Sequence, residues 1–348
     1  MQRRHFDPEG TLATEMFEEI TEIRVHRPEV IEREAKRRRK RPKLTVHGKL
    51  ALVAADHPGR GVTNIRDDQL AMGDRYQLIA RVRRLLEDPN LDGVLATSDL
   101  LEELLILSHL ERRQKNDGFL DGRVLVGSMN RGGLSGTAFE MDDTFTGMTA
   151  ERLAELRCDG GKMLYRLDTQ DAASARTIEA CAEAINALRQ HRLAAFVEAL
   201  EVRREGKTYH TIQDSAALIR QCGIAAALGE SSAHVWLKLP YTEDFARVGR
   251  ATTLPILLLG GPARESPTET LRDFAVGLGS SPRVRGAVIG RNLLFPLDQD
   301  PLPMCRALTA MIHRGASFDE AVELLTEVPV AVKERSNARP TRRQRLSA

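Results

Sequence analysis

Aromatic residues are scarce in this chain. They make up 4% of its 348 residues, whereas hydrophobic residues as a whole make up 42%. The core must therefore consist mainly of aliphatic side chains, as is usual in parallel sheets covered by helices. This composition favours an α/β protein with one large domain or two medium ones.

Cysteines, long apolar runs and net charge are also low. The four cysteines lie far apart, with no CxxC pair and no histidine at zinc-ligand spacing, so neither a disulfide framework nor a zinc site is indicated. No uncharged run approaches the roughly 18 residues that a membrane span needs. The formal net charge of +2 gives no sign of a polyanionic partner. We therefore expect a cytoplasmic protein, and we expect neither a membrane nor a nucleic acid as its partner.

The first 47 residues predict a helical extension, with helices over 11–24 and 28–41. The extension ends in the basic run Arg37-Arg38-Arg39-Lys40-Arg41-Pro42-Lys43. Such a run could contact phosphate or nucleic acid. We favour a solvated helix end, because the helix dipole favours cations near the C-terminus. At the other end of the chain, the polar and basic residues 333–348 predict a disordered tail.

From residue 50 onward, short apolar runs alternate with amphipathic segments of helical length. This alternation predicts parallel βαβ units. Eight such units, in about 270 residues, fit a (β/α)₈ barrel over residues 48–332. An open dinucleotide-binding sheet fits less well, because no GxGxxG motif follows the first strand. The predicted strands cover residues 50–56, 93–97, 124–128, 160–166, 194–198, 234–238, 256–260 and 287–290.

Lys238 is the first candidate for chemistry, because barrel active sites lie at the C-terminal ends of the strands. The apolar alternate residues of its strand would pack against the outer helices, which leaves His234, Trp236 and Lys238 facing the interior. Burial or a nearby cation lowers the pKa of a lysine and makes a neutral, nucleophilic amine available. Lys238 is therefore a candidate Schiff-base nucleophile.

Three further charged residues are expected close to Lys238. Lys162 faces inward on the fourth strand, and its charge could lower the pKa of Lys238. Glu198 ends the fifth strand, where its carboxylate could act as general acid and base, and Asp56 ends the first strand. Each residue alone could be a charged side chain that is exposed to water at the edge of the barrel. Two lysines and two acids on converging strand ends favour catalysis.

Two glycine-containing segments predict a phosphate site. Gly260-Gly261 follows the seventh strand and Gly290-Arg291 follows the eighth. Barrels commonly bind phosphate at these positions through backbone N–H groups, and Arg291 would add a charge-assisted contact. Asp56 and His57 offer too few ligands for a catalytic divalent metal, so we expect neither a metal nor an organic cofactor.

Several segments resemble the lysine-dependent aldolases, a superfamily that includes archaeal-type class I fructose-bisphosphate aldolases and bacterial tagatose-bisphosphate aldolases. The resemblance extends roughly over residues 48–315. More closely, the chain resembles an actinobacterial barrel group associated with myo-inositol catabolism. The segments that carry the resemblance are Ala54-Ala55-Asp56-His57, Gly161-Lys162-Met163-Leu164-Tyr165, Phe196-Val197-Glu198, Leu237-Lys238-Leu239-Pro240-Tyr241 and Gly290-Arg291-Asn292.

The resemblance implies a role for each charged residue. Lys238 matches the Schiff-base lysine, Lys162 the assisting lysine, Glu198 the proton-transferring carboxylate and Asp56 the first-strand acid. The implied protein is an aldehyde-lyase that reversibly cleaves a phosphorylated ketose or deoxy-keto acid sugar. The resemblance also implies a homo-oligomer. One departure concerns the phosphate site, because Leu258-Leu259 precedes the glycine pair where the family often has a serine.

Two alternatives remain open. The first is a related barrel transferase that uses the same lysine. The second is a barrel without chemistry that binds a sugar phosphate or, through its basic run, nucleic acid. Trapping of a carbonyl ligand on Lys238 would distinguish the enzymes from the binding protein.

Overall fold

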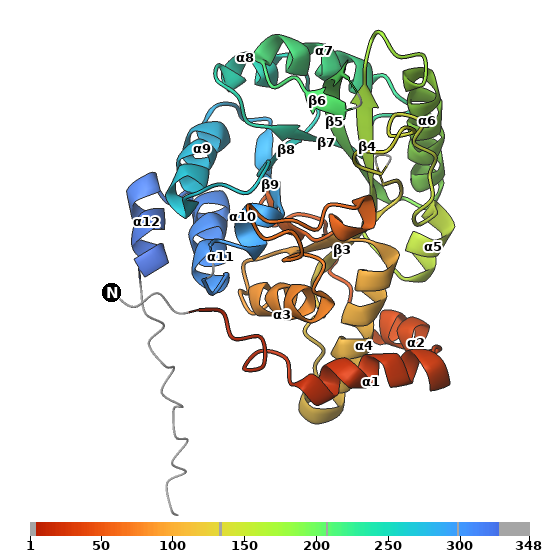
Figure 1. Ribbon diagram of the computed structural model, residues 1–348, viewed down its shortest axis with the longest axis vertical. Coiled ribbons are helices and arrows are strands. Elements are labelled where there is room, and N and C mark those ends of the chain that lie inside the picture. The colour runs from red at the N-terminus through yellow and green to blue at the C-terminus, as the bar shows by residue number, and fades with distance from the viewer. Residues whose placement is uncertain (1–4, 132–133, 207, 298, 327–348) are drawn as a thin grey trace, which may run out of the picture.

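The computed structural model describes residues 5–131, 134–206, 208–297 and 299–326. The predicted tail over 333–348 lies outside the described residues. Eight of the strands are parallel: β1 (Leu50–Ala54), β2 (Gly93–Ala96), β3 (Val124–Ser128), β4 (Gly160–Leu167), β5 (Ala194–Glu205), β7 (Val235–Pro240), β8 (Ile256–Leu259) and β9 (Val284–Ile289). They pair in this order, and β9 returns to β1, so the ring is closed (Figure 1). The predicted (β/α)₈ barrel is confirmed.

Helices surround the barrel. They are α3 (Arg75–Leu85), α4 (Ser98–Lys115), α5 (Ala150–Glu155), α6 (Ser174–Gln190), α7 (Ser215–Ala226), α8 (Phe245–Arg250), α9 (Pro267–Gly279), α10 (Arg291–Leu294), α11 (Leu302–Thr309) and α12 (Phe318–Thr326), with the short turns η1 (Pro58–Arg60) and η2 (Ala310–Arg314). Side-chain caps fix several helix starts, since Asp74 accepts from the Gln77 N–H and Asp214 from the Ala217 N–H. Within the described residues, no helix combines the length and apolar character needed to cross a bilayer.

The fifth strand differs from the prediction. It continues beyond Glu198 to Glu205 and pairs antiparallel with β6 (Thr208–Thr211), a strand that is not among those predicted from the sequence. Gly206 has a φ of 64°, which permits the tight reversal between the two strands. Glu198 therefore lies within a long strand and not at its end.

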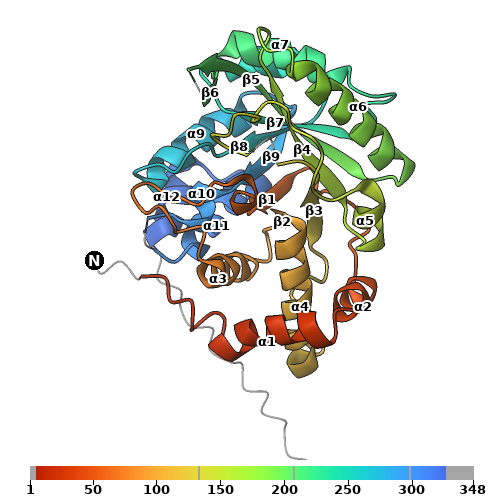
Figure 2. The same cartoon turned by 45° about the vertical axis from the view of Figure 1, so that its right-hand side comes forward.

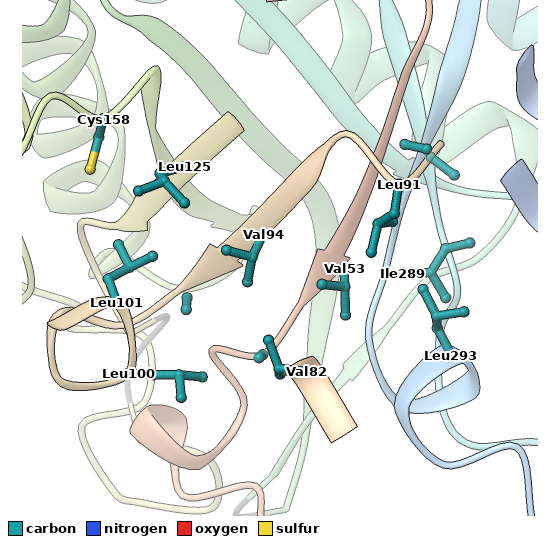
Figure 3. Packing of buried hydrophobic residues seen from close by; sticks show 14 of the residues in the cluster. Val53, Val82, Leu91, Val94, Leu100, Leu101, Leu125, Cys158, Ile289 and Leu293 are labelled. Atoms are coloured by element: carbon teal, nitrogen blue, oxygen red, sulfur yellow. The ribbon is translucent and has the colours of Figure 1, made fainter. Parts of the chain in front are cut away.

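Strand alternation separates two apolar layers. Side chains such as Leu52, Phe196 and Val288 fill the barrel interior. Figure 3 shows side chains of the outer layer, which come from the strands (Val53, Val94, Leu125, Ile289) and from α3, α4 and α10 (Val82, Leu100, Leu101, Leu293). The apolar alternate residues of β7, which are Val235, Leu237 and Leu239, also belong to this outer layer. The prediction that this face packs against the helices is confirmed.

The N-terminal segment forms α1 (Thr14–His26) and α2 (Val30–Arg37), which pack against α4 (Figures 1 and 2). Its apolar residues Ile23, Val30 and Ala35 are fully buried in the outer layer. The helical extension is thus part of the packed structure.

The basic run that follows α2 crosses the N-terminal end of the barrel. Arg38 is 1% exposed and donates to the carbonyl oxygens of Arg123 and Arg157, at 2.8 and 2.6 Å. Lys40 donates to the carbonyl of Cys158, and Arg41 pairs with Asp92 at 2.8 Å. The predicted solvated helix end is therefore wrong for these three side chains. Their partners lie far along the sequence, just before β2, β3 and β4, and the run itself does not reveal them.

Candidate active site

The four charged residues singled out in the sequence lie together at the C-terminal mouth of the barrel. Lys162 Nζ lies 2.8 Å from Asp56 Oδ2 and 3.1 Å from Glu198 Oε2. The same Glu198 oxygen lies 2.8 Å from Lys238 Nζ. The charges thus alternate from acid to base in one chain, and Glu198 Oε2 is shared by two amines.

The sheet register explains this arrangement. Glu198 is directly opposite Lys238 across the β5–β7 pair, and Lys162 is opposite Phe196 across the β4–β5 pair. All of these side chains point inward by strand alternation. Two residues before Glu198 and Lys238, the rings of Phe196 and Trp236 meet with centroids 6.2 Å apart. These rings belong to the apolar cluster of the barrel interior.

The two lysines have opposite pKa shifts. Burial lowers the pKa of Lys238, and the neighbouring Lys162 charge lowers it further, so that it lies below the ordinary value despite the Glu198 carboxylate. Burial also disfavours the charge on Lys162, but the carboxylates of Asp56 and Glu198 outweigh this effect and raise the pKa of Lys162. Lys238 is therefore the amine that deprotonates more easily, and Lys162 stays an ammonium group.

Both acids remain ionised. Burial alone would raise the pKa of Asp56 and of Glu198, yet the nearby lysines hold both pKa values well below their usual range. At neutral pH, each side chain is a carboxylate that can accept a proton. Such a pair of carboxylates beside an amine with a lowered pKa can serve proton transfers during carbonyl chemistry.

His57 follows Asp56 directly and lies under the end of β9. Burial lowers the pKa of His57 to about 3, so its ring is neutral. A Cβ atom at Gly290 would lie 2.2 Å from His57 Cε1, so a glycine is required there for this close approach. The sequence raised His57 and Asp56 as a weak metal pair. Within the described part of the chain, no group of three His, Cys, Asp or Glu residues is placed to hold a metal ion.

The two glycine-containing segments expected to bind phosphate lie side by side. Gly260-Gly261 follows β8 and Gly290-Arg291 follows β9, and these strands are neighbours in the barrel. The Asn292 side chain joins the segments, because its Nδ2 donates to the carbonyls of Gly260 and Pro262 at 2.7 and 2.8 Å. The structure thus brings the predicted phosphate-binding residues to one side of the mouth, next to β7.

Arg60 was missed by sequence reasoning. It ends the turn η1, and its charge lies close enough to lower the pKa values of Asp56 and Glu198. Its Nε atom and that of Arg291 are buried and have no hydrogen-bond partner among the described residues. The sequence contained a signal for Arg60, because this basic residue lies four positions after Asp56, shortly after a strand. Arg291 was singled out because it also follows a strand.

Three comparisons place this fold among known proteins. The structure of Cgl0159 from Corynebacterium glutamicum is similar with a TM-score of 0.81 and 37% identity, over 88% of this chain and 99% of that one. A Schiff-base-forming fructose-1,6-bisphosphate aldolase is similar with a TM-score of 0.53 and 18% identity, over 81% of this chain and 100% of that one, which shows a shared fold. An uncharacterised aldolase from Saccharolobus solfataricus is 34% identical over 92 residues, which span 26% of this chain and 32% of that protein.

These findings confirm the resemblance to aldolases and to an actinobacterial barrel protein. The match to the Cgl0159-like family extends over residues 48–307, which is most of the barrel. The chain therefore belongs to the Cgl0159-like family.

Proposed function

We propose that this protein is a class I aldolase. It makes or breaks a carbon–carbon bond in a phosphorylated ketose or deoxy-keto acid sugar, within inositol or other carbohydrate catabolism. The observation that carries the proposal is Lys238, a buried amine with a lowered pKa that is 2.8 Å from a carboxylate and close to a second lysine that stays charged. The fold shared with a Schiff-base-forming aldolase and the sequence likeness to an uncharacterised aldolase support it.

The first steps form the covalent intermediate. The neutral Lys238 amine attacks the ketone carbon of the substrate, and the carbonyl oxygen takes one proton from the solvent and becomes a hydroxyl group. Glu198, at 2.8 Å, accepts a proton from the nitrogen. It then returns this proton to the hydroxyl group, which leaves as water, and an iminium ion remains.

The next steps break the carbon–carbon bond. The Asp56 carboxylate accepts the proton of the substrate hydroxyl, the adjacent carbon–carbon bond breaks, and an aldehyde leaves. The electron pair of that bond moves toward the iminium nitrogen and gives an enamine. The proton held by Asp56 passes to the enamine carbon. Addition of water then releases the ketone fragment, restores Lys238 and returns one proton to the solvent. Lys162 lies between Asp56 and Glu198, and its charge favours the ionised form of both acids between these proton transfers.

The phosphate group adjoins the reacting ketone in this proposal. Gly260-Gly261 and Gly290-Arg291 lie beside β7, which carries Lys238, because β7, β8 and β9 are successive neighbours. Backbone N–H groups and the Arg291 guanidinium would hold the phosphate by charge-assisted hydrogen bonds. The desolvated Arg291 side chain, whose pKa is lowered by burial, would regain stabilisation from such an anion.

Borohydride trapping tests this proposal. The protein is incubated with dihydroxyacetone phosphate and a panel of phosphorylated ketoses, reduced with sodium borohydride, and weighed as the intact chain. We expect a mass increase equal to one reduced adduct, and aldol turnover that a chelator leaves unchanged. The absence of an adduct with every carbonyl compound would contradict the proposal and favour the sugar-phosphate-binding alternative. An adduct without aldol cleavage or synthesis would favour the transferase.

A further inference from the structure

We propose that the C-terminal segment of this chain, residues 327–348, docks in an acidic groove on the outside of the barrel. The groove lies between the loop that follows β1 and the loop that follows β8. The inference goes beyond the proposed function and does not depend on it, because it concerns a contact of the chain with itself. The lining residues that carry the argument are Asp67, Asp68, Leu70, Asp74 and Glu265.

The groove is large enough to hold several side chains, with a volume of about 640 Å³. Its lining includes the rings of Phe6 and Phe295, which lie 4.4 and 4.5 Å from the Arg81 guanidinium. The Arg66 guanidinium donates to the Arg264 carbonyl at 3.2 Å and so joins the loop after β1 to the loop after β8. The two walls of the groove are therefore connected without any occupant.

Four carboxylates line the groove, and we call them the groove carboxylates: Asp67, Asp68, Asp74 and Glu265. All four side chains are exposed, and none forms an ion pair with a residue in the described ranges. Asp68 and Asp74 each accept one backbone N–H through Oδ1 only, at 2.9 and 3.0 Å. The nearby Arg81 donates to two backbone carbonyls, at 3.1 and 3.3 Å. The groove thus presents negative charge that the described residues do not balance.

An apolar side chain lies among these acids. Leu70 is 70% exposed, which is the highest value for a large apolar side chain in the part of the chain that the structure describes. It lies between Asp68 and Asp74 in the sequence and lines the same groove. Exposed apolar surface bordered by polar groups is typical of interaction sites. We therefore expect an occupant that carries both apolar and basic side chains.

A second groove of the molecule serves as a comparison. It has a volume of about 460 Å³ and lies beside the turn between α1 and α2. Its acids Glu32 and Glu102 pair with Arg152 at 2.9 and 3.4 Å, and Glu102 also pairs with Arg24 at 3.2 Å. The charges of that groove are thus balanced from within. The groove beside α3 differs because its acids have no such partners.

The composition of residues 327–348 matches this requirement. Three valines, at positions 328, 330 and 332, come first. The basic residues that follow are Lys333, Arg335, Arg339, Arg342, Arg343 and Arg345, against the two acids Glu327 and Glu334. A polar segment without a core of its own can order on a surface that supplies apolar and charged contacts.

The segment also begins in the right region of the fold. It follows α12 directly, and α12 packs against α9 and α11, while α11 contacts α3 (Figure 1). Asp74 directly precedes α3, and Glu265 lies two residues before α9, so the groove is at the start of two helices in this group. An extended segment of this length spans up to about 70 Å. The segment can therefore reach the groove of its own chain.

Limited proteolysis of the full-length protein tests the proposal. Trypsin cleaves after arginines such as Arg342 and Arg343, and its rate follows the population in which the segment is undocked. The variant Asp67→Asn/Asp68→Asn/Glu265→Gln removes three of the groove carboxylates. We expect it to be cleaved about 3- to 10-fold faster at these arginines, because several exposed ion pairs are lost together.

The matched control removes three exposed acids elsewhere. Asp117→Asn/Glu179→Gln/Glu183→Gln makes the same change in charge at the end of α4 and on α6. This control should be cleaved at the rate of the unmodified protein, and thermal unfolding checks that both variants are folded. Equal cleavage rates of the groove variant and the control would overturn the proposal.

Cross-linking identifies the occupant. A carbodiimide joins an amine to a carboxylate that it contacts directly. Arg339→Lys and Arg343→Lys keep the charge and add two amines to that of Lys333. In an equal mixture of ¹⁵N-labelled and unlabelled full-length protein, we expect links from these amines to the groove carboxylates within one chain. Links between labelled and unlabelled chains would show that a second copy supplies the segment, and they would overturn the proposal. Links to other acids only, or no links, would also overturn it.

Discussion

Both ends of the barrel hold cationic side chains, but the hydrogen-bond acceptors around these side chains differ. At the N-terminal end, Arg38 donates to two carbonyls, Lys40 to one, and Arg41 pairs with an aspartate. At the C-terminal mouth, Lys162 and Lys238 share one oxygen of Glu198. In this protein, the cations at the N-terminal end have their own fixed acceptors, whereas the two lysines at the mouth share one carboxylate oxygen.

The physical cause is the supply of acceptors. The N-terminal end offers backbone carbonyls that precede β2, β3 and β4, and these acceptors stay fixed when the protein works. The mouth offers two carboxylates for two lysines and two nearby arginines, and the Nε atoms of Arg60 and Arg291 have no partner among the described residues. The first arrangement suits stability, and the second suits the binding and turnover of an anion.

Removal of the nucleophile should have the largest effect. We expect Lys238→Met to abolish adduct formation and to lower aldol turnover by more than about 10³-fold. The fold should persist, because an apolar side chain of similar length replaces a buried amine whose pKa is lowered. Trapping and thermal unfolding of the variant check both statements. Residual adduct in the folded variant would show that another lysine reacts.

Removal of the second lysine should have the next largest effect. Schiff-base formation requires the neutral form of Lys238. The pKa of this amine is lowered below the ordinary value of 10.5, and the rate of Schiff-base formation rises as the pH increases through that lowered pKa. Lys162→Met removes a cation that lowers that pKa. We expect trapping to slow by about 10²-fold near pH 7 and its rise with pH to move to higher pH. A rise that stays in place or moves to lower pH would contradict the role given to Lys162.

The proposed phosphate contact should give a smaller effect. We expect Arg291→Ala to raise KM for a phosphorylated substrate by about 10- to 100-fold, the range for loss of a charged hydrogen bond. KM for the unphosphorylated analogue should change much less. Steady-state kinetics with both compounds provide the measurement. Equal effects would show that Arg291 does not contact the phosphate.

A change at the N-terminal end should affect stability and leave chemistry intact. Arg38→Met leaves the carbonyls of Arg123 and Arg157 without this donor, so we expect the free energy of unfolding to fall by about 1–3 kcal/mol in urea titration. The rate of trapping on Lys238 should remain within about 2-fold below the unfolding transition. A large loss of trapping in the folded variant would undermine the distinction between the two ends.

The sequence predicted the barrel because its signal is local. Apolar runs alternate with amphipathic segments, and the two-residue period of Val235, Leu237 and Leu239 determines that Lys238 faces inward. The hairpin over Thr208–Thr211 escaped prediction, because its strand is polar and lies above the barrel, where no apolar face is needed. Local periodicity carries little information about such a segment.

The parts of the site that depend on long-range contacts were harder to predict. The partners of Arg38 are carbonyls 85 and 119 residues away, and nothing in the basic run indicates them. The position of Arg60 depends on the packing of His57 under Gly290, a contact between the first and last strands of the ring. Both cases show that the fate of a charged side chain is determined by acceptors that the neighbouring sequence does not contain.

Peptide mapping of the reduced adduct tests the central claim most directly. Lys162 and Lys238 both lie within about one hydrogen-bond length of Glu198, yet only Lys238 has a pKa below its ordinary value. After borohydride reduction with dihydroxyacetone phosphate and proteolysis, the account predicts that mass spectrometry finds the modification on Lys238 alone. A modification on Lys162, with Lys238 unlabelled, would contradict it.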